Sequence, residues 1–238
     1  MKIEIFPDTE GVARAAAKLI AEEARTAVAA RGKFVMAVSG GKTPWIMLHD
    51  FAEEDVTWNA VHVFQVDERI APPGDPDRNL THMRESLLTH ARLHPEHIHA
   101  MPVESQDLEA SCKRYARTLE EIAGSPPVLD LVHLGLGPDG HTASLVPGDP
   151  VLDVSDADVA LTGIYQGRRR MTLTFPTINR SRLVLWLVTG GEKAGMLARL
   201  WTTDMSIPAG HVLSDRSLVL ADRAAATQVD KNSKTQVA

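Results

Sequence analysis

Residues 129–147, LDLVHLGLGPDGHTASLVP, join an apolar run of strand length to a glycine-rich exit. Gly135, Gly137 and Gly140 close the run, and His141 follows them with two hydroxyl residues close behind. Glycine lets the backbone adopt positive φ and approach a ligand closely, and the amides that it frees can bind an anion or an oxyanion. Open α/β sheets build their sites in this way, at the carboxyl end of a strand. We therefore expect His141 to lie beside a bound ligand.

The spacing G-x-G-x-x-G at residues 135–140 also matches the dinucleotide-binding fingerprint. That fingerprint needs a helix at its third glycine and a second strand that ends in an acidic residue about twenty positions later. Residues 147–150, PGDP, stop any helix after roughly one and a half turns, and no clear strand precedes the next acidic residues. Nicotinamide binding is therefore disfavoured, and a histidine that only fills the turn is the main alternative for His141.

Length and composition bound the fold class and the partners. The 238 residues, with 44% hydrophobic and 24% charged side chains, fit one α/β domain over residues 1–238 with a polar tail from about residue 222. A net charge of −6 argues against nucleic-acid binding, and no apolar window approaches the length of a membrane span. Cys112 is the single cysteine, and residues 1–6 alternate like a strand rather than a signal peptide. We expect a cytoplasmic protein.

Hydrophobic patterns predict strands and helices that alternate along the chain. Strands are expected at residues 1–6, 33–38, 61–66, 129–134, 159–163, 170–175 and 182–189, and helices at 11–31, from 44, at 79–88, 106–123 and 193–201. Crossovers of one hand bring successive carboxyl ends to the same edge of a parallel sheet. The prediction is a three-layer, Rossmann-like α/β domain with a mainly parallel sheet and a site at that edge.

Residues 39–44, SGGKTP, lead out of a predicted buried strand into a helix. Thr43 is placed as the N-cap and Pro44 as the first helical residue. The free amides and partial positive charge of a helix N-terminus favour a phosphate cradle here. A nucleotide P-loop is disfavoured because it needs a glycine where the chain has Met36. A tight turn without a ligand is the plain alternative.

Charged residues occur at two further strand ends. Residues 67–69, DER, follow a buried strand directly, and buried charges need partners, so these are more readily site residues than a solvated face. Asn79 is placed to cap the next helix. Lys193 lies in the first turn of a helix, where a cation opposes the macrodipole and a bound anion would relieve the conflict. We therefore expect Lys193 to bind an anion.

Three histidines crowd into residues 94–99 in the pattern H-x-x-H-x-H. A structural zinc site needs four ligands at suitable spacing, and no fourth ligand is in view here. The segment is predicted to be a loop that enters a short strand, and no metal site is expected.

Four segments in order, residues 39–44, 67–69, 135–145 and 170–193, closely resemble the glucosamine-6-phosphate isomerase/6-phosphogluconolactonase family over about residues 1–221. Deaminases of this family look like H-I-A-F-N-E after the histidine, whereas this chain has HTASL, which favours a lactonase. The chain departs from the usual pattern at residues 77–80, DRNL, and at residues 166–169, QGRR, where a proline pair commonly precedes the arginine. The second departure leaves open whether Arg169 or Arg170 faces the site.

The resemblance implies a carboxylic ester hydrolase that converts 6-phospho-D-glucono-1,5-lactone to 6-phosphogluconate in the oxidative pentose phosphate pathway, without cofactor or metal. It implies that His141 is the general base for water, and that Asp67 and Arg69 are catalytic. Asp67 would accept hydrogen bonds from sugar hydroxyls or hold a cation, and Arg69 would stabilise the oxyanion or contact substrate. The implied substrate- and phosphate-binding residues are Ser39, Gly40, Gly41, Thr43, Glu68, Asn79, Gly137, Asp139, Gly140, Arg170 and Lys193.

Two other functions stay open at this point: an isomerase-deaminase that acts on glucosamine 6-phosphate, and a sugar-phosphate-binding module without catalysis. A binding module needs no base, so His141 together with Asp67 and Arg69 favours an enzyme. The expected partner is a small sugar phosphate. We expect no nucleic-acid or membrane partner, and a monomer or weak homodimer.

Overall fold

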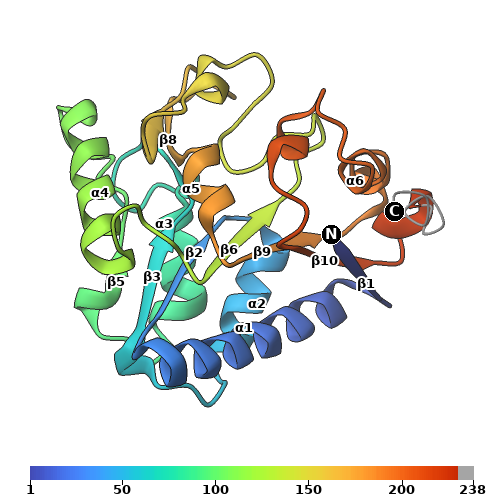
Figure 1. Ribbon diagram of the computed structural model, residues 1–238, viewed down its shortest axis with the longest axis horizontal. Helices are drawn as coiled ribbons and strands as arrows, with labels where there is room; N and C mark the ends of the chain where they lie inside the picture. The colour runs from blue at the N-terminus through green and yellow to red at the C-terminus, as the bar shows by residue number, and fades with distance from the viewer. Residues whose placement is uncertain (230–238) are drawn as a thin grey trace.

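A computed structural model describes residues 1–229 (Figure 1). Its centre is a seven-stranded sheet in which every neighbouring pair is parallel, with the order β1-β10-β9-β6-β2-β3-β5. The strands are β1 Lys2–Phe6, β2 Phe34–Val38, β3 Val61–Gln65, β5 Ile98–His99, β6 Leu131–Gly135, β9 Leu183–Val188 and β10 Ser217–Asp222. The predicted α/β fold with a mainly parallel sheet is confirmed.

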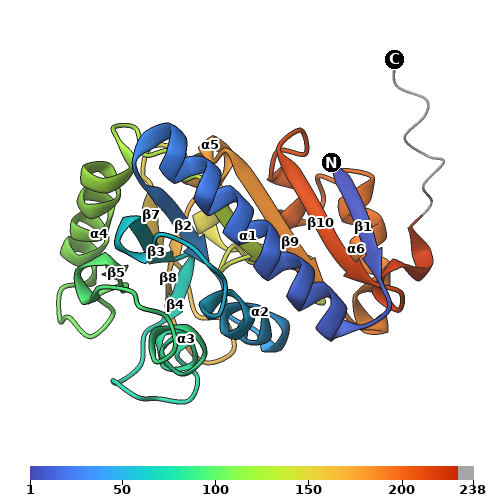
Figure 2. The ribbon, with the colours of Figure 1, turned by 90° about the horizontal axis from the view of Figure 1, so that it is seen from below.

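Helices cover both faces of the sheet. They are α1 Thr9–Arg31, α2 Lys42–Ala52, α3 Asn79–Met83, α4 Leu108–Ala123, α5 Phe175–Arg180 and α6 Ala194–Trp201. Figure 2 shows α1 crossing the strands on one face, with α2 beside it. Helices α4, α5 and α6 contribute to the core on the other face.

The alternation of side chains along each strand divides the core into two layers. In β2, Phe34, Met36 and Val38 pack with α1 and α2, whereas Val35 and Ala37 pack with the opposite layer. All five residues of β2 are buried, which is why this strand is a continuous apolar run rather than an alternating one. The sequence pattern and the three-layer fold thus agree.

A small second sheet, which the sequence patterns did not predict, lies beside the main one. It consists of β4 Asp67–Arg69, β8 Arg170–Leu173 and β7 Val159–Leu161, all antiparallel. Val66 is where the chain changes sheets, since its amide donates to Val38 O at 3.0 Å and its carbonyl accepts from Leu173 N at 2.8 Å. Residues 67–69 therefore form a strand of their own instead of a strand end.

The ends of three helices test the predicted caps. Helix α1 stops at Gly32, which has a φ of 77°, as predicted. Helix α2 begins two residues earlier than expected, at Lys42 with Gly41 as its N-cap, so Thr43 is not the cap. Asn79 is likewise the first residue of α3 rather than its cap, because a carboxylate from elsewhere in the chain satisfies the helix amides. A π-helical turn over Arg84–Leu88 continues α3 to the predicted end.

The C-terminal segment is ordered beyond the point where a polar tail was expected. Asp222 accepts hydrogen bonds from Gly190 N at 3.0 Å and from Ala225 N at 2.7 Å, and it thereby starts a 3₁₀ turn over Ala225–Gln228. Ala225 is buried in the core. The rest of the predicted tail, residues 230–238, lies outside the described residues. Among residues 1–229, no helix is both long and apolar enough to cross a membrane.

Candidate active site

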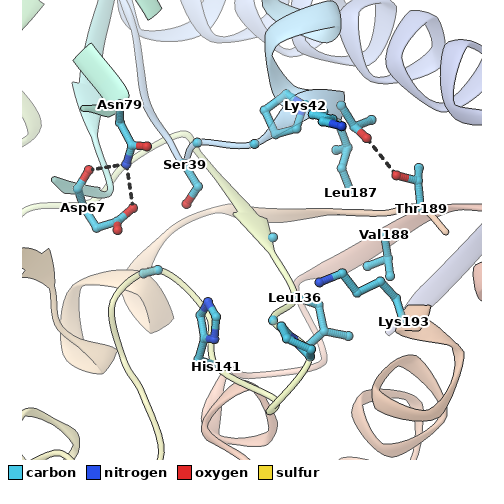
Figure 3. A pocket seen from close by; sticks show the side chains of 18 of the residues that line it. Ser39, Lys42, Asp67, Asn79, Leu136, His141, Leu187, Val188, Thr189 and Lys193 are labelled. Carbon is cyan, nitrogen blue, oxygen red and sulfur yellow. Dashed lines mark hydrogen bonds between the residues drawn. The ribbon is translucent and has the colours of Figure 1, made fainter. Parts of the chain in front are cut away.

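The carboxyl ends of β2, β6 and β9 and the small sheet surround a cavity of about 400 Å³ (Figure 3). The convergence of strand ends on one edge is confirmed. The cavity is lined by these residues of the predicted site: Ser39, Gly40, Gly41, Thr43, Asp67, Arg69, Asn79, Gly137, His141, Arg170 and Lys193. Glu68, Asp139 and Gly140 were also predicted as ligands but are not part of its lining.

His141 lies in the loop after β6, and its ring lines the cavity. Its Nδ1 is 2.5 Å from Oδ1 of Asp139, and its backbone amide donates to the same oxygen at 3.1 Å. Because a carboxylate only accepts, Nδ1 carries the hydrogen and Nε2 keeps its lone pair. The Asp139–His141 pair thus has the arrangement of an oriented general base.

Asp139 lies behind the imidazole, which corrects its predicted role as a substrate ligand. Its second oxygen accepts a hydrogen bond from the Tyr165 hydroxyl at 3.0 Å. Partial burial acts to raise the pKa of Asp139, but the hydrogen bonds from His141 and Tyr165 outweigh it and lower the pKa below its ordinary value. The group therefore stays ionised and can stabilise a protonated imidazole.

Close packing explains why two positions of the loop are glycine. A Cβ on Gly137 would overlap the His141 ring, and a Cβ on Gly140 would overlap the side chain of Ile207. Gly140 also has a φ of 82°, in the left-handed region that favours glycine. Gly140 therefore shapes the turn that aims His141, and its predicted role as a ligand is corrected.

Asp67, Arg69 and Asn79 form one polar network in the lining of the cavity, and Figure 3 shows Asp67 and Asn79 across the cavity from His141. The Asp67 carboxylate accepts from Ser144 Oγ at 2.6 Å and from Asn79 Nδ2 at 3.3 Å, and Asn79 Oδ1 accepts from the Arg69 guanidinium. A Cβ on Gly40 would overlap Asn79, so the loop after β2 packs directly on this network. Asn79 therefore links Asp67 to Arg69 by hydrogen bonds instead of capping α3.

Glu68 points away from the cavity, which corrects its predicted role in binding. Successive side chains of a strand point to opposite faces, so Asp67 and Arg69 of β4 reach the cavity and Glu68 does not. It is fully buried and accepts from Asn79 N at 2.8 Å and Leu80 N at 2.9 Å. Glu68 is thus the side chain that satisfies the first amides of α3.

Unsatisfied donors and cationic groups in the lining make this cavity suited to an anion. Ser39 Oγ and Arg170 Nε are buried and have no hydrogen-bond partner within residues 1–229. Lys193 extends into the cavity from the turn before α6 (Figure 3), and the N-terminus of α2 faces the cavity at Gly41. Buried donors of this kind are satisfied by an oxyanion, and a helix N-terminus adds a favourable partial charge.

Arg170, not Arg169, faces the site. Its exposed fraction is 4%, and burial and the nearby Arg69 lower its pKa below the ordinary value. Arg169 donates instead to the Thr162 carbonyl at 3.2 Å, outside the cavity lining. Arg169 immediately precedes β8, and the side chains of successive residues in an extended segment point to opposite sides.

The partners of two side chains near the site have no local signal in the sequence. Ser144 lies three residues after His141 but bonds to Asp67, which is 77 positions away. Tyr165 reaches Asp139 from a separate hairpin. Lys42, Thr189 and Glu192 also line the cavity, and Thr189 Oγ1 is 2.7 Å from Thr43 Oγ1.

The histidines at residues 94–99 are not part of the lining of this cavity, and the predicted loop and short strand are confirmed by the 3₁₀ turn Pro95–His97 and β5. No three His, Cys, Asp or Glu side chains in the described part of the chain gather closely enough to hold a metal ion.

Comparisons with known proteins agree with this geometry. The model of the family "Glucosamine-6-phosphate isomerases/6-phosphogluconolactonase" matches residues 7–220. The 6-phosphogluconolactonases of Nostoc sp. and Mycobacterium tuberculosis are 32% and 36% identical to the chain, each over 95% of this chain and 98% of the relative. The crystal structure of 6-phosphogluconolactonase from Thermotoga maritima superimposes with a TM-score of 0.82 at 29% identity, over 93% of this chain and 98% of that one. A monomeric glucosamine-6-phosphate deaminase shares the fold, with a TM-score of 0.84 at 21% identity over 96% of this chain and all of that one (100%). The chain belongs to the glucosamine-6-phosphate isomerase/6-phosphogluconolactonase family.

Proposed function

We propose that this protein is a 6-phosphogluconolactonase, which hydrolyses 6-phospho-D-glucono-1,5-lactone to 6-phosphogluconate. One observation carries the proposal: a carboxylate-oriented histidine, His141, lines the same cavity as the anion site of Arg170, Lys193 and the loop at Gly41. Lactone hydrolysis needs a base for water and a way to hold the ring beside it. Binding of the phosphate group of the substrate would keep the lactone ring beside His141.

In the proposed reaction His141 Nε2 removes a proton from a water molecule as the water oxygen bonds to the lactone carbonyl carbon. Asp139 stabilises the imidazolium that forms, as in other oriented base pairs. When the ring C–O bond breaks, the imidazolium returns its proton to the departing ring oxygen. The products balance as a carboxylic acid and a hydroxyl, and the step needs no oxidant, metal or cofactor.

The opposite wall of the cavity has the groups that the sugar and the oxyanion require. Asp67, which is held by Ser144 and Asn79, accepts hydrogen bonds from sugar hydroxyls in this proposal. Arg69 uses one amino group on Asn79, and its other N–H donors serve a substrate oxygen. Binding energy from the phosphate then orients the reacting carbon against His141.

The test is a coupled assay on freshly generated lactone, with 6-phosphogluconate measured as it forms and the spontaneous hydrolysis rate subtracted. Ammonia release from glucosamine 6-phosphate is measured in parallel. We expect lactone turnover that depends on enzyme concentration, and no ammonia. Ammonia without lactone turnover would make the protein a deaminase, and binding of 6-phosphogluconate without either reaction would make it a binding module. We also propose that the protein is cytoplasmic and that it is a monomer or weak homodimer. Sedimentation of the purified chain tests the oligomeric state.

A further inference from the structure

Residues 162–170 form a tight hairpin beside the cavity, in the segment that departs from the family's usual proline-containing pattern. Gln166 and Gly167 have φ values of 52° and 80°, as the two central residues of a type I′ turn require. Tyr165 and Arg168 pair across the turn, with N···O distances of 3.0 and 3.3 Å. This pairing fixes the direction in which the Tyr165 side chain leaves the backbone.

Hydrogen bonds at its base and ion pairs near its tip fix the hairpin. At the base, Thr162 N donates to Arg170 O at 2.9 Å and Arg170 N donates to Thr162 Oγ1 at 3.1 Å. At the tip, the Arg168 guanidinium binds Asp75 at 3.0 Å and Asp77 at 3.2 Å, across the gap to the loop before α3. Tyr165 is therefore held in place by its surroundings.

Tyr165 contacts both the Asp139–His141 pair and Arg170. Its hydroxyl donates to Asp139 Oδ2 at 3.0 Å, and its ring meets the His141 ring edge to face at 5.4 Å between centroids. On its other side, Cζ of Arg170 lies 4.9 Å from the ring centroid. Gln166 Oε1 accepts from Arg170 Nη2 at 3.1 Å, so the hairpin holds this arginine twice.

These contacts have two physical consequences. With His141 on one oxygen and Tyr165 on the other, the Asp139 carboxylate cannot rotate, and the hydroxyl withdraws part of the negative charge that would otherwise stabilise an imidazolium. The negative face of the tyrosine ring attracts the guanidinium of Arg170 and restricts its position.

We propose that Tyr165 is a positioning residue that aligns the Asp139–His141 pair and, through its ring, the anion-binding Arg170. The proposal rests on the proposed function, because it assigns a role in that reaction.

The titratable and charged groups around His141 all influence the pH dependence of the reaction. Asp139 and Tyr165 are the titratable side chains bonded to its ring, with the Tyr165 hydroxyl 3.4 Å from Nδ1. The charged groups that line the same cavity are Lys42, Asp67, Arg69, Arg170, Glu192 and Lys193. A change at Tyr165 alone leaves all of these in place.

The first test compares Tyr165→Phe, which removes only the hydroxyl, with Tyr165→Leu, which also removes the ring. For Tyr165→Phe we expect kcat to fall about 3- to 10-fold with KM within twofold, and the acid limb of the kcat/KM profile to move up by roughly 0.3–1 pH unit. The limb moves up because a carboxylate without the phenol stabilises the imidazolium more. Tyr165→Leu should in addition raise KM about 3- to 20-fold.

Ile164→Ala is the matched control, because Ile164 is the adjacent residue and its side chain is 76% exposed. We expect wild-type kinetics and the wild-type pH profile from it. Thermal unfolding of each variant confirms that the folded fraction is being compared.

An NMR titration of the His141 imidazole in the full chain tests the proposal without turnover, with the resonance assigned by its loss in His141→Gln. A higher titration midpoint in Tyr165→Phe supports the proposal even if the wild type proves inactive on the lactone, in which case only the proposed function fails. An unchanged midpoint together with an unchanged pH profile in folded Tyr165→Phe overturns it, whatever happens to kcat.

Discussion

Two groups of histidines in this protein have opposite surroundings. His141 bonds to a carboxylate and faces the cavity, whereas His62, His97 and His99 pack against one another at the β3–β5 edge of the sheet. His62 Nδ1 lies 3.1 Å from His99 Nε2, and the His99 ring stacks on Phe64. Burial, reinforced by neighbouring histidines and, at His62, by Lys33, lowers the pKa of His62 and of His99 to about 4.

The comparison shows what makes a histidine usable as a base. Accepting a proton creates a cation, which a bonded carboxylate stabilises and a buried site among other imidazoles does not. The base role proposed for His141 therefore fits its surroundings, whereas burial among imidazoles keeps His62 and His99 neutral.

Replacing the base should have the largest effect. His141→Gln should lower kcat by about 10²–10⁴, with KM changed little, because proton removal occurs in the transition state and the phosphate binds elsewhere. His62→Gln is the matched control, since it removes a histidine from the other group, and it should keep wild-type kcat near neutral pH. Near-wild-type turnover by folded His141→Gln, after correction for spontaneous hydrolysis, would place the base elsewhere.

Removing the carboxylate beside His141 makes its surroundings more like those of the edge histidines, and it should lower kcat less than loss of His141 itself. Asp139→Asn removes the negative charge and can present an amide hydrogen to Nδ1, which favours the wrong tautomer. We expect kcat to fall by about 10- to 100-fold while KM stays within a few-fold. Steady-state kinetics at several pH values check this, and a variant with unchanged kcat would remove Asp139 from the mechanism.

Removing an anion ligand should separate binding from proton transfer. Lys193→Ala should raise KM about 10- to 100-fold, because a charged hydrogen bond to a desolvated anion contributes about 1.5–3 kcal/mol. The exposed Lys113 on α4 provides the control, and Lys113→Ala should leave KM unchanged. Titration with 6-phosphogluconate gives the same comparison at equilibrium; equal affinities for the two variants would contradict the assignment.

The edge histidines should affect stability rather than catalysis. Because the pKa of His62 and of His99 is lowered to about 4, the unfolded chain binds more protons than the folded chain between about pH 6.5 and 4. Their contribution is complete above pH 6.5 and is lost as the pH falls toward 4. The buried His133, whose pKa burial lowers to about 3, acts in the same direction.

We therefore expect Tm to fall by about 3–8 °C between pH 7 and pH 5 in the wild type. His62→Gln should show a smaller fall, and the exposed His90→Gln should match the wild type. Calorimetry at both pH values makes the measurement, and identical slopes for the two variants would show that the edge cluster does not control acid stability.

Local sequence patterns were enough to predict the main sheet, the edge where the site lies and several residues on that edge. Buried parallel strands are continuous apolar runs, so β2, β6 and β9 could be recognised locally, and crossovers of one hand place their carboxyl ends together. His141 and Gly41 lie in the loops that follow β6 and β2, which is why their place in the cavity was predictable.

Tertiary structure alone decided which side chains are partners. Glu68 and Asp67 are neighbours in sequence, yet the small antiparallel sheet sends one to cap α3 and the other to the cavity. Asp139 and Tyr165 meet only because the hairpin turns at Gln166. Local periodicity reports which face of a strand or helix is buried, but a hydrogen bond between residues 26 positions apart depends on how separate elements pack.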